Sequence, residues 1–270
     1  MQRKPFLKWA GGKYRVLDKI LKELPIGSRF VEPFAGSCAV YLNVEAKRAL
    51  ICDANADLIY LYQHIQREGK EFISYCQEFF TPINNTKERY IEIRDEFNIC
   101  KKPRKRGAIF LYLNRHSFNG LVRYNSKGEF NVPFGKYKSP YFPLKELMDF
   151  YKKTQETETC FLCCDFRNTF NKLEKGDVVY CDPPYIPLSV TSNFTTYTGN
   201  EFSIKDQKDL ALLSKSAHNK NITVVLSNHD TSITRSLYAD AELRTFNVQR
   251  FISCNGDNRS AVPEILAIYR

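Results

Sequence analysis

The stretch VVYCDPPY, residues 178–185, decides the fold: a short apolar run ends in an acidic residue, a proline pair and an aromatic ring. Such a run is typical of a buried parallel strand, and ligands of open α/β sheets bind at the carboxyl ends of strands. Similar apolar runs that end in acidic or turn residues recur along the chain. The predicted strands are residues 29–32, 49–53, 159–165, 178–182 and 223–228.

Helix-like segments lie between these runs, at residues 39–45, 58–67, 144–153 and 204–217, with Ser203 as a plausible N-cap of the last. Alternation of strand and helix predicts an α/β, doubly wound, Rossmann-like sheet. Two further strand-like runs, 243–248 and 264–269, are separated by a polar, Gly-containing loop. They predict an antiparallel C-terminal hairpin at the sheet edge.

The alternation breaks after the second run, where residues 57–144 read as amphipathic helices followed by a turn-rich segment. We expect an inserted, mostly helical domain there, with residues 1–56 and 145–270 forming the body. The net charge is +10, from 40 Lys and Arg against 30 Asp and Glu, and positive charge favours polyanionic partners.

The insert carries most of this charge, because residues 101–138 contain ten basic residues and one acidic residue, Glu129. The basic residues are Lys101, Lys102, Arg104, Lys105, Arg106, Arg115, Arg123, Lys127, Lys136 and Lys138. Interleaved aromatic residues suit nucleic-acid contact by stacking as well as by charge. The aromatic residues are Phe110, Tyr112, Phe118, Tyr124, Phe130, Phe134 and Tyr137. A solvated charged surface is the alternative reading.

Composition excludes several other classes. Apolar residues make up 43% of the chain, which is ordinary for a globular protein. The nine cysteines imply no closed disulfide framework, and the CxxC spacing at 160–163 has no second Cys or His pair at zinc-finger distance, so no metal is expected. No apolar h-region or membrane span is visible. We therefore expect a cytoplasmic protein with reduced thiols, monomeric by default.

The tetrapeptide Asp182-Pro183-Pro184-Tyr185 suits the binding of a planar amine. An amine conjugated to a base ring is a poor nucleophile because its lone pair is delocalised. An Asp oxygen and a carbonyl fixed by the prolines can accept both N–H bonds, while the Tyr ring stacks on the base. Cys181 lies inside the strand before the Asp, which argues against a nucleophilic thiolate. The alternative is a strand-ending turn with a buried proline pair.

Two other segments predict a cofactor site. VEPFAGS, residues 31–37, leads from the first strand into a Gly turn, and Asp53 at the end of the second strand can accept bonds from ribose hydroxyls. A dinucleotide-binding GxGxxG is absent. FLKWAGGK, residues 6–13, offers an aromatic, a Gly pair and two ammonium groups for the carboxylate end of a ligand, but no P-loop.

Three further motifs complete the pattern: NRHSFNGLVRYN at 114–125, GEFNVPFG at 128–135 and SNHDT at 227–231. With the segments above, the chain from Phe6 to Tyr269 resembles the DNA adenine methyltransferase (Dam) family of the D12 class. The resemblance implies a site-specific enzyme that flips an adenine of GATC out of double-stranded DNA and methylates its N6 with S-adenosyl-L-methionine. It also implies association with the nucleoid through DNA binding.

The resemblance further implies roles for particular residues. Catalysis falls to Asp182, Pro183, Pro184 and Tyr185, whose loop continues through Phe194 and Tyr197. The cofactor-binding residues are Trp9, Lys13, Glu32, Phe34, Gly36, Asp53, Asp165, Phe166 and Asp182. The DNA-binding residues are Lys8, Phe118, Asn119, Leu121, Arg123, Pro133, Lys136 and Tyr137, with Phe118 and Asn119 forming a wedge between base pairs. Arg123 donating to guanine is the expected chemistry of a base contact.

The sequence departs from the family pattern at three positions. Cys38 stands where the cofactor loop usually has a second Gly, Phe118 where a relative has Tyr, and Lys136 where relatives have Arg. Lys cannot make the planar fork contact of Arg. Two other hypotheses remain open: methyl transfer to an RNA base amine or a guanine amine, and a DNA-binding relative that has lost catalysis.

Overall fold

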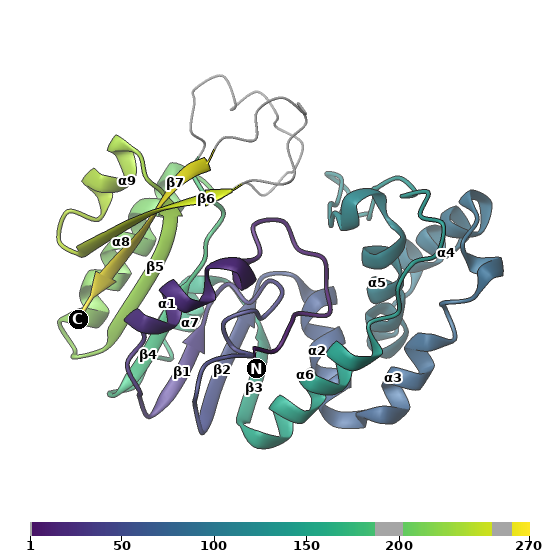
Figure 1. Cartoon of the computed structure of the whole chain (residues 1–270), viewed down its shortest axis with the longest axis horizontal. Coiled ribbons are helices and arrows are strands. Elements are labelled where there is room, and N and C mark those ends of the chain that lie inside the picture. The colour runs from purple at the N-terminus through teal and green to yellow at the C-terminus, as the bar shows by residue number, and fades with distance from the viewer. Residues whose placement is uncertain (1, 187–201, 250–260) are drawn as a thin grey trace.

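The computed structural model describes residues 2–186, 202–249 and 261–270. These residues form a seven-stranded mixed sheet in the order β3-β2-β1-β4-β5-β7-β6 (Figure 1). The strands are β1 (Arg29–Glu32), β2 (Arg48–Asp53), β3 (Glu158–Cys163), β4 (Asp177–Cys181), β5 (Thr223–His229), β6 (Glu242–Gln249) and β7 (Ala261–Tyr269). The first five strands pair in parallel, whereas β7 pairs antiparallel with both β5 and β6. The predicted doubly wound sheet with an antiparallel C-terminal hairpin is confirmed.

The strand order reverses between β1 and β4, which lie side by side with Val31 opposite Val179. From β1 the chain continues to β2 on one side, while β4 continues to β5 on the other. The carboxyl ends of strands at such a switch point form the crevice in which doubly wound sheets bind ligands. Glu32 ends β1 and Asp182 follows β4, so the topology brings these two carboxylates to the same edge.

Helices cover both faces of the sheet and extend beyond the β3 edge (Figure 1). The α-helices are α1 (Leu17–Glu23), α2 (Ala56–Glu68), α3 (Lys70–Gln77), α4 (Lys87–Ile99), α5 (Pro103–His116), α6 (Leu144–Glu156), α7 (Phe166–Phe170), α8 (Ile204–His218) and α9 (Ser232–Leu237). Short 3₁₀ turns are η1 (Lys13–Val16), η2 (Pro82–Asn84) and η3 (Phe118–Gly120). None of the helices within the described ranges is long and apolar enough to cross a membrane.

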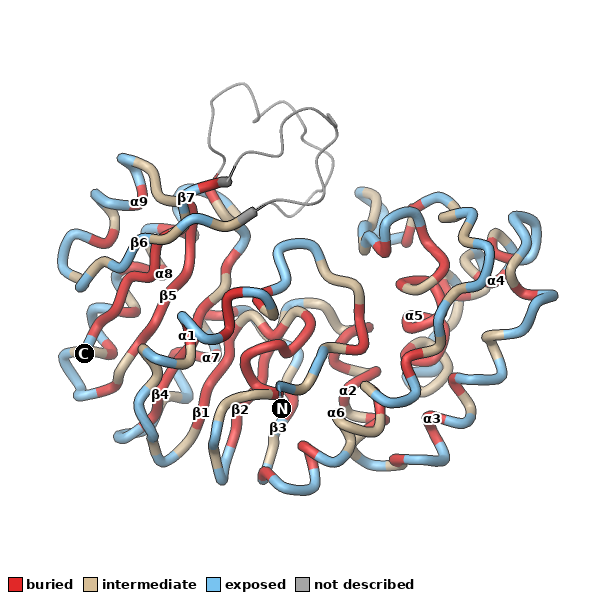
Figure 2. Tube along the Cα trace, viewed as in Figure 1, coloured by how far each residue is buried: buried red, intermediate tan, exposed pale blue. Residues whose placement is uncertain are grey.

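Consecutive strand residues point to two separate cores, as the two-residue period of a strand requires. Phe30 belongs to the core shared with α1, α2 and α6, and Val31 to the core under α7 and α8. The first core continues through α2 into α3, α4 and α5. Figure 2 shows β1, β2, β4 and β5 buried along most of their length, whereas β3 and β6 at the two edges of the sheet are mostly half-buried or exposed. The inserted helices are thus packed against the sheet through α2 and share its core.

Local capping explains where several elements begin. The Ser203 side chain accepts from the Asp206 backbone N–H and so caps α8, which confirms the predicted N-cap. The third strand ends at Cys163, two residues earlier than predicted, because Asp165 caps α7 by accepting from the Arg167 N–H at 2.9 Å. The other predicted strands agree with the structure to within about three residues at either end, as is usual for element boundaries.

The prediction of a helix over residues 39–45 was wrong. The segment instead forms a series of turns, buried on most sides. Cys38, which precedes it, has a left-handed backbone with φ of +58°, so the chain does not enter the segment in a helical conformation. The Asn43 side chain then donates to the carbonyls of Ala39 and Arg3, which ties the segment to the N-terminus.

Candidate functional site

Asp182 lies at the end of β4 and is held by two side chains from distant parts of the sequence. The Lys13 ammonium is 3.0 Å from its Oδ1, and the Ser227 hydroxyl donates to the same oxygen at 2.9 Å. Ser227 is fully buried on β5, and its oxygen lies 3.1 Å from the Tyr180 hydroxyl. The Asp182 carboxylate is therefore oriented by Ser227 from the sheet and by Lys13 from the N-terminal segment.

The residues after Asp182 are fixed as well, from α8 and β5. Gln207 donates to the Pro184 carbonyl at 2.7 Å, and Asn228 accepts from the Ile186 N–H at 3.1 Å. Among the described residues none donates to the Pro183 carbonyl. Of the two proline carbonyls, that of Pro183 is thus the acceptor that remains for a ligand beside Asp182.

Tyr185 presents its ring next to Asp182. Its hydroxyl donates to Glu264 of β7 at 3.1 Å, and its ring contacts the His229 ring edge to face. The Lys13 ammonium lies 4.5 Å from the Tyr185 ring centroid. A cation at this position fits the negative face of the ring. Lys13 therefore contacts both Asp182 and Tyr185 of the predicted catalytic tetrapeptide.

The loop after β1 is built around Asp53 at the end of β2. Its carboxylate accepts from the backbone N–H groups of Gly36 at 3.0 Å and Asn55 at 2.9 Å. Gly36 has φ of +43°, and a Cβ at this position would lie 2.8 Å from the Trp9 indole nitrogen. Only glycine fits there, so the N-terminal segment packs directly on the loop.

Glu32 is 2% exposed, and its Oε2 has no hydrogen-bond partner among the described residues. Burial, followed by the charges of Asp182 and Asp53, raises the pKa of Glu32 well above its ordinary value. Burial also raises the pKa of Asp53, against the backbone N–H groups that lower it. A buried oxygen without a partner is costly, so this edge of the sheet is prepared for a ligand that donates hydrogen bonds.

An aromatic cluster lies next to this edge. Phe34 and Phe166 stack with ring centroids 5.5 Å apart, and Phe202 contacts both rings. Asp165, at the start of α7, holds Arg167 beside Phe166. The predicted cofactor residues on the loops after β1 and β3 are thus adjacent, and Phe202 is a member of the cluster that the sequence did not reveal.

The predicted DNA-binding residues come together on one surface outside the sheet. Lys8 packs against Gly120, and its ammonium lies 3.8 Å from the Tyr137 ring centroid. The Phe118 N–H donates to the Pro133 carbonyl at 2.8 Å, which joins the 118–121 turn to the 133–137 segment. Phe118 is 51% exposed despite its size, which is compatible with its predicted role as a wedge between base pairs.

Two asparagines that the sequence did not single out organise this surface. Asn114 bonds the backbone of Lys8 in both directions and the carbonyl of Gly120. Asn131 accepts from the Arg123 guanidinium at 2.8 Å and so directs it. Asn119 and Lys136 both have φ of +54°, a conformation in which Asn is common and Lys is not. In the sequence, only the turn-rich composition of this segment indicated such backbone conformations.

Three of the five basic residues in the run 101–106 are paired with acidic residues, so they are less available to a polyanionic partner than the charge count predicts. Arg104 pairs with Glu68 and Lys105 with Glu96, whereas Arg106 is bonded to Asp57. Only Lys101 and Lys102 of this run are exposed. Acidic residues from α2 and α4 neutralise the rest, a tertiary effect that the local charge count could not reveal.

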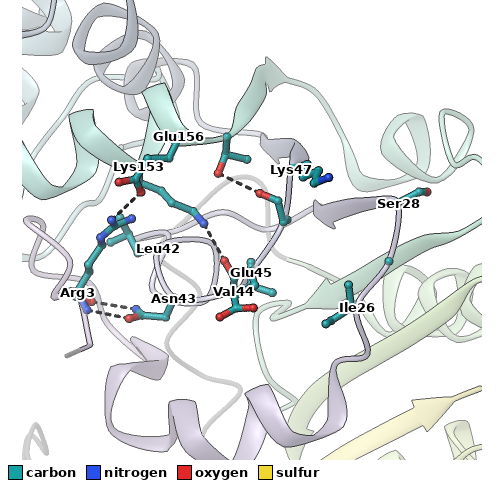
Figure 3. Close-up of a pocket in the computed structure, with 13 residues that line it drawn as sticks. Arg3, Ile26, Ser28, Leu42, Asn43, Val44, Glu45, Lys47, Lys153 and Glu156 are labelled. Carbon is teal, nitrogen blue, oxygen red and sulfur yellow. Dashed lines mark hydrogen bonds and ion pairs between the residues drawn. The ribbon is translucent and has the colours of Figure 1, made fainter.

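A cavity of about 790 Å³ lies at the opposite, amino-terminal edge of the sheet (Figure 3). Within it the Lys153 ammonium donates to the Val44 carbonyl at 2.7 Å, and Arg3 and Asn43 bond each other twice. These contacts fasten α6 and the N-terminus to the loop before β2. No predicted site residue lines the cavity, and we assign it no function.

Two residues of the predicted catalytic loop, Phe194 and Tyr197, lie outside the described residues.

Comparison with known proteins agrees with this geometry. The family model described as "D12 class N6 adenine-specific DNA methyltransferase" matches residues 9–252. Proteins named DNA adenine methylase are similar over the whole chain: that of Salmonella typhi is 46% identical and that of Escherichia coli K12 is 45% identical, each over 100% of this chain and 96% of the relative. That of Haemophilus influenzae is 47% identical, over 100% and 94%.

Solved structures add little. The C-terminal domain of precorrin-6Y C5,15-methyltransferase from Rhodobacter capsulatus covers 98% of this chain and 96% of that domain, with a TM-score of 0.39 and 8% identity. We draw nothing from it. The family model and the full-length relatives suffice: this chain belongs to the family of D12 class N6 adenine-specific DNA methyltransferases.

Proposed function

We propose that this protein transfers a methyl group from S-adenosyl-L-methionine to the N6 amine of an adenine flipped out of double-stranded DNA at GATC. The observation that carries the proposal is the setting of Asp182. Its carboxylate is held by Ser227 and Lys13 beside the Tyr185 ring and the Pro183 carbonyl, at the switch point of the sheet. This arrangement provides two acceptors and one stacking surface for a planar amine.

The residues present at the sheet edge fit the proposed cofactor. S-adenosyl-L-methionine carries a sulfonium, an ammonium and ribose hydroxyls, and the edge offers the carboxylates of Glu32, Asp53 and Asp182. The Glu32 oxygen without a partner supports this fit, since a donor group would satisfy it. Asp53 would hold the ribose, and Phe34 and Phe166 with Asp165 would border the adenine. Trp9, Lys13 and the Gly36 loop would enclose the amino-acid end.

When bound, the cofactor supplies an electrophilic methyl carbon. The chain's own part in the reaction lies in how it holds the amine. Asp182 and the Pro183 carbonyl each accept one N–H, which localises the nitrogen lone pair, while the Tyr185 ring keeps the base in plane. The nitrogen held at Asp182 would supply the electron pair of the new bond, and the cofactor would supply the methyl carbon and retain the electron pair of its sulfur. The amine then loses one proton, and the Asp182 carboxylate is the adjacent acceptor.

We assign DNA recognition to residues 57–144 and the chemistry to residues 1–56 and 145–270. Arg123 would donate to guanine, Lys8, Leu121 and Pro133 would contact other base edges, and Lys136 and Tyr137 the backbone. Phe118 with Asn119 would form the wedge that opens the helix. The proximity of several of these residues supports their joint role in DNA recognition, and the name of the relatives, DNA adenine methylase, supports adenine in DNA as the substrate. The GATC specificity is the part of the proposal that rests on the resemblance of the sequence motifs.

The test is methyl transfer from labelled S-adenosyl-L-methionine to a GATC duplex, compared with the same duplex already methylated at both adenines. We expect incorporation only into the unmethylated duplex, and none with the Asp182→Ala variant, which should still bind DNA. Equal incorporation into both duplexes would contradict the proposal. Preferential methylation of ribosomal RNA offered in competition would instead favour an RNA substrate.

A further inference from the structure

Asp57 is a buried carboxylate that lies between the cofactor edge and the DNA-binding surface. It is 5% exposed, at the second residue of α2. The Arg106 guanidinium of α5 binds both of its oxygens, with Nε 2.6 Å from Oδ1 and Nη2 2.9 Å from Oδ2. Arg106 also donates to the carbonyls of Phe97 and Cys100 at the end of α4. A bidentate pair with these additional bonds is geometrically well defined.

Tyr124 is the third donor to Asp57. Its hydroxyl lies 2.8 Å from Oδ2, and burial together with the Asp57 charge raises the pKa of Tyr124, so the hydroxyl stays a donor. Tyr124 follows the proposed guanine contact Arg123 directly. It pairs with Phe130 across a short antiparallel bridge, and the Arg123 carbonyl accepts from the Asn131 N–H. The phenolic oxygen of Tyr124 therefore anchors the segment 121–131 directly to α2, while Asn98 of α4 bonds the Phe130 backbone in both directions.

The other side of Asp57 leads to the cofactor edge in two steps. The Asn55 side chain caps α2 by accepting from the Asp57 and Leu58 N–H groups, at 3.0 and 3.2 Å. The Asn55 N–H in turn donates to Asp53 at 2.9 Å, the carboxylate that also holds the Gly36 loop. The hydrogen bonds on this side of Asp57 join residues that are at most three positions apart in the sequence. A continuous set of contacts thus joins Asp53 to the residue next to Arg123.

We infer that Asp57 and Tyr124 are positioning residues that couple cofactor binding at Asp53 to DNA reading by the segment 121–131. The inference rests on the proposed function, because it assigns the cofactor to one end of the contacts and the duplex to the other. A cofactor that engages Asp53 orders residues 53–57, and Tyr124 transmits that order to the segment beside Arg123. The conformational entropy lost when the first ligand orders this segment is not lost again when the second ligand binds, so the two ligands bind cooperatively.

Tyr124→Phe is the test, because it removes one hydroxyl and leaves the ring and the Asp57–Arg106 pair in place. The matched control is Tyr112→Phe. Tyr112 is fully buried, so its ring is not a stacking surface for DNA, contrary to the sequence prediction. Its hydroxyl donates to the Asn84 carbonyl, away from Asp53. For each full-length protein, the dissociation constant for a GATC duplex is measured with and without saturating S-adenosylhomocysteine. The ratio of the two constants reports the coupling, and a thermal melt reports folding.

We expect the native protein and Tyr112→Phe to bind the duplex about tenfold more tightly with the cofactor product, within the usual range of coupling. Tyr124→Phe should reduce this ratio to within about twofold of one, since the direct bond between the segment and Asp57 is lost. Its affinity for the cofactor product without DNA should be unchanged. As a second measurement, the cofactor product should slow amide hydrogen exchange in residues 121–131 of the native protein and not in Tyr124→Phe.

The inference is overturned by a ratio near one in the native protein, by an undiminished ratio in Tyr124→Phe, or by equal losses in both variants. Methylation of the same duplex distinguishes this failure from failure of the proposed function. A native protein that methylates GATC but shows no coupling contradicts the inference alone. A native protein that binds the duplex and not the cofactor product contradicts both.

Discussion

Replacing Ser227 by Ala tests how the sheet orients Asp182. The Ser227 hydroxyl is fully buried and donates to Asp182 Oδ1 at 2.9 Å, and a hydrogen bond to a charged group contributes about 1.5–3 kcal/mol. If that free energy serves to hold Asp182 in its reactive orientation, its loss lowers the rate of methyl transfer by roughly 10- to 150-fold. The Lys13 pair remains, so the carboxylate stays in the site but turns more freely.

The assay is single-turnover methyl transfer with cofactor and GATC duplex both saturating, so that binding does not limit the rate. The control is Ser214→Ala, which removes another buried hydroxyl, bonded to the Leu210 carbonyl at 2.8 Å within α8. We expect Ser214→Ala to retain the native rate. A Ser227→Ala rate within twofold of native, or an equal loss in both variants, would refute the orienting role.

Three further predictions concern specificity and stability. Arg123→Ala should lose about 1–3 kcal/mol of discrimination at one guanine in competition assays with substituted sites; an unchanged preference would leave Arg123 a phosphate contact. Gly36→Ala should destabilise the protein more than Gly128→Ala, because a Cβ at residue 36 would meet Trp9, whereas Gly128 has a positive φ but no neighbour within 4 Å. Denaturant unfolding midpoints measure the difference, and equal midpoints would count against the close contact. Burial lowers the pKa of His116 from 6.5 to about 4. The free energy of unfolding is therefore highest above pH 6.5, where His116 is neutral in both states, and it falls by about 3 kcal/mol as the pH drops to about 4. His116→Asn should remove that part of the pH dependence of unfolding, and an unchanged slope would contradict it.

Much of the fold was predictable because the central strands are buried on both faces and appear as continuous apolar runs. The run before Asp182 and the Ser203 cap are examples in which local chemistry determines the element. The segment 39–45 was not predictable, since its course depends on the left-handed backbone at Cys38. Sequence pattern reports burial and capping, whereas it does not report a backbone conformation imposed by packing.

The candidate site shows the same difference between what local sequence predicts and what depends on tertiary packing. The residues that end strands, such as Asp53 and Asp182, were identified because parallel topology brings strand ends together. The partner of Asp182 was not, because Ser227 reaches it only in the folded chain. The pairing of Arg104 with Glu68 likewise depends on how α5 packs against α2. Contacts between distant segments are what the sequence alone did not provide.

The central claim is that Asp182 holds an adenine amine of GATC for methylation. Its most direct test is sequencing of N6-methyladenine in DNA from a methylation-free host that expresses either the native chain or Asp182→Ala. The account predicts methylated adenine at GATC with the native chain and at no site with the variant. Unmodified GATC sites in cells that express the folded native chain, or equal methylation by the two proteins, would contradict it.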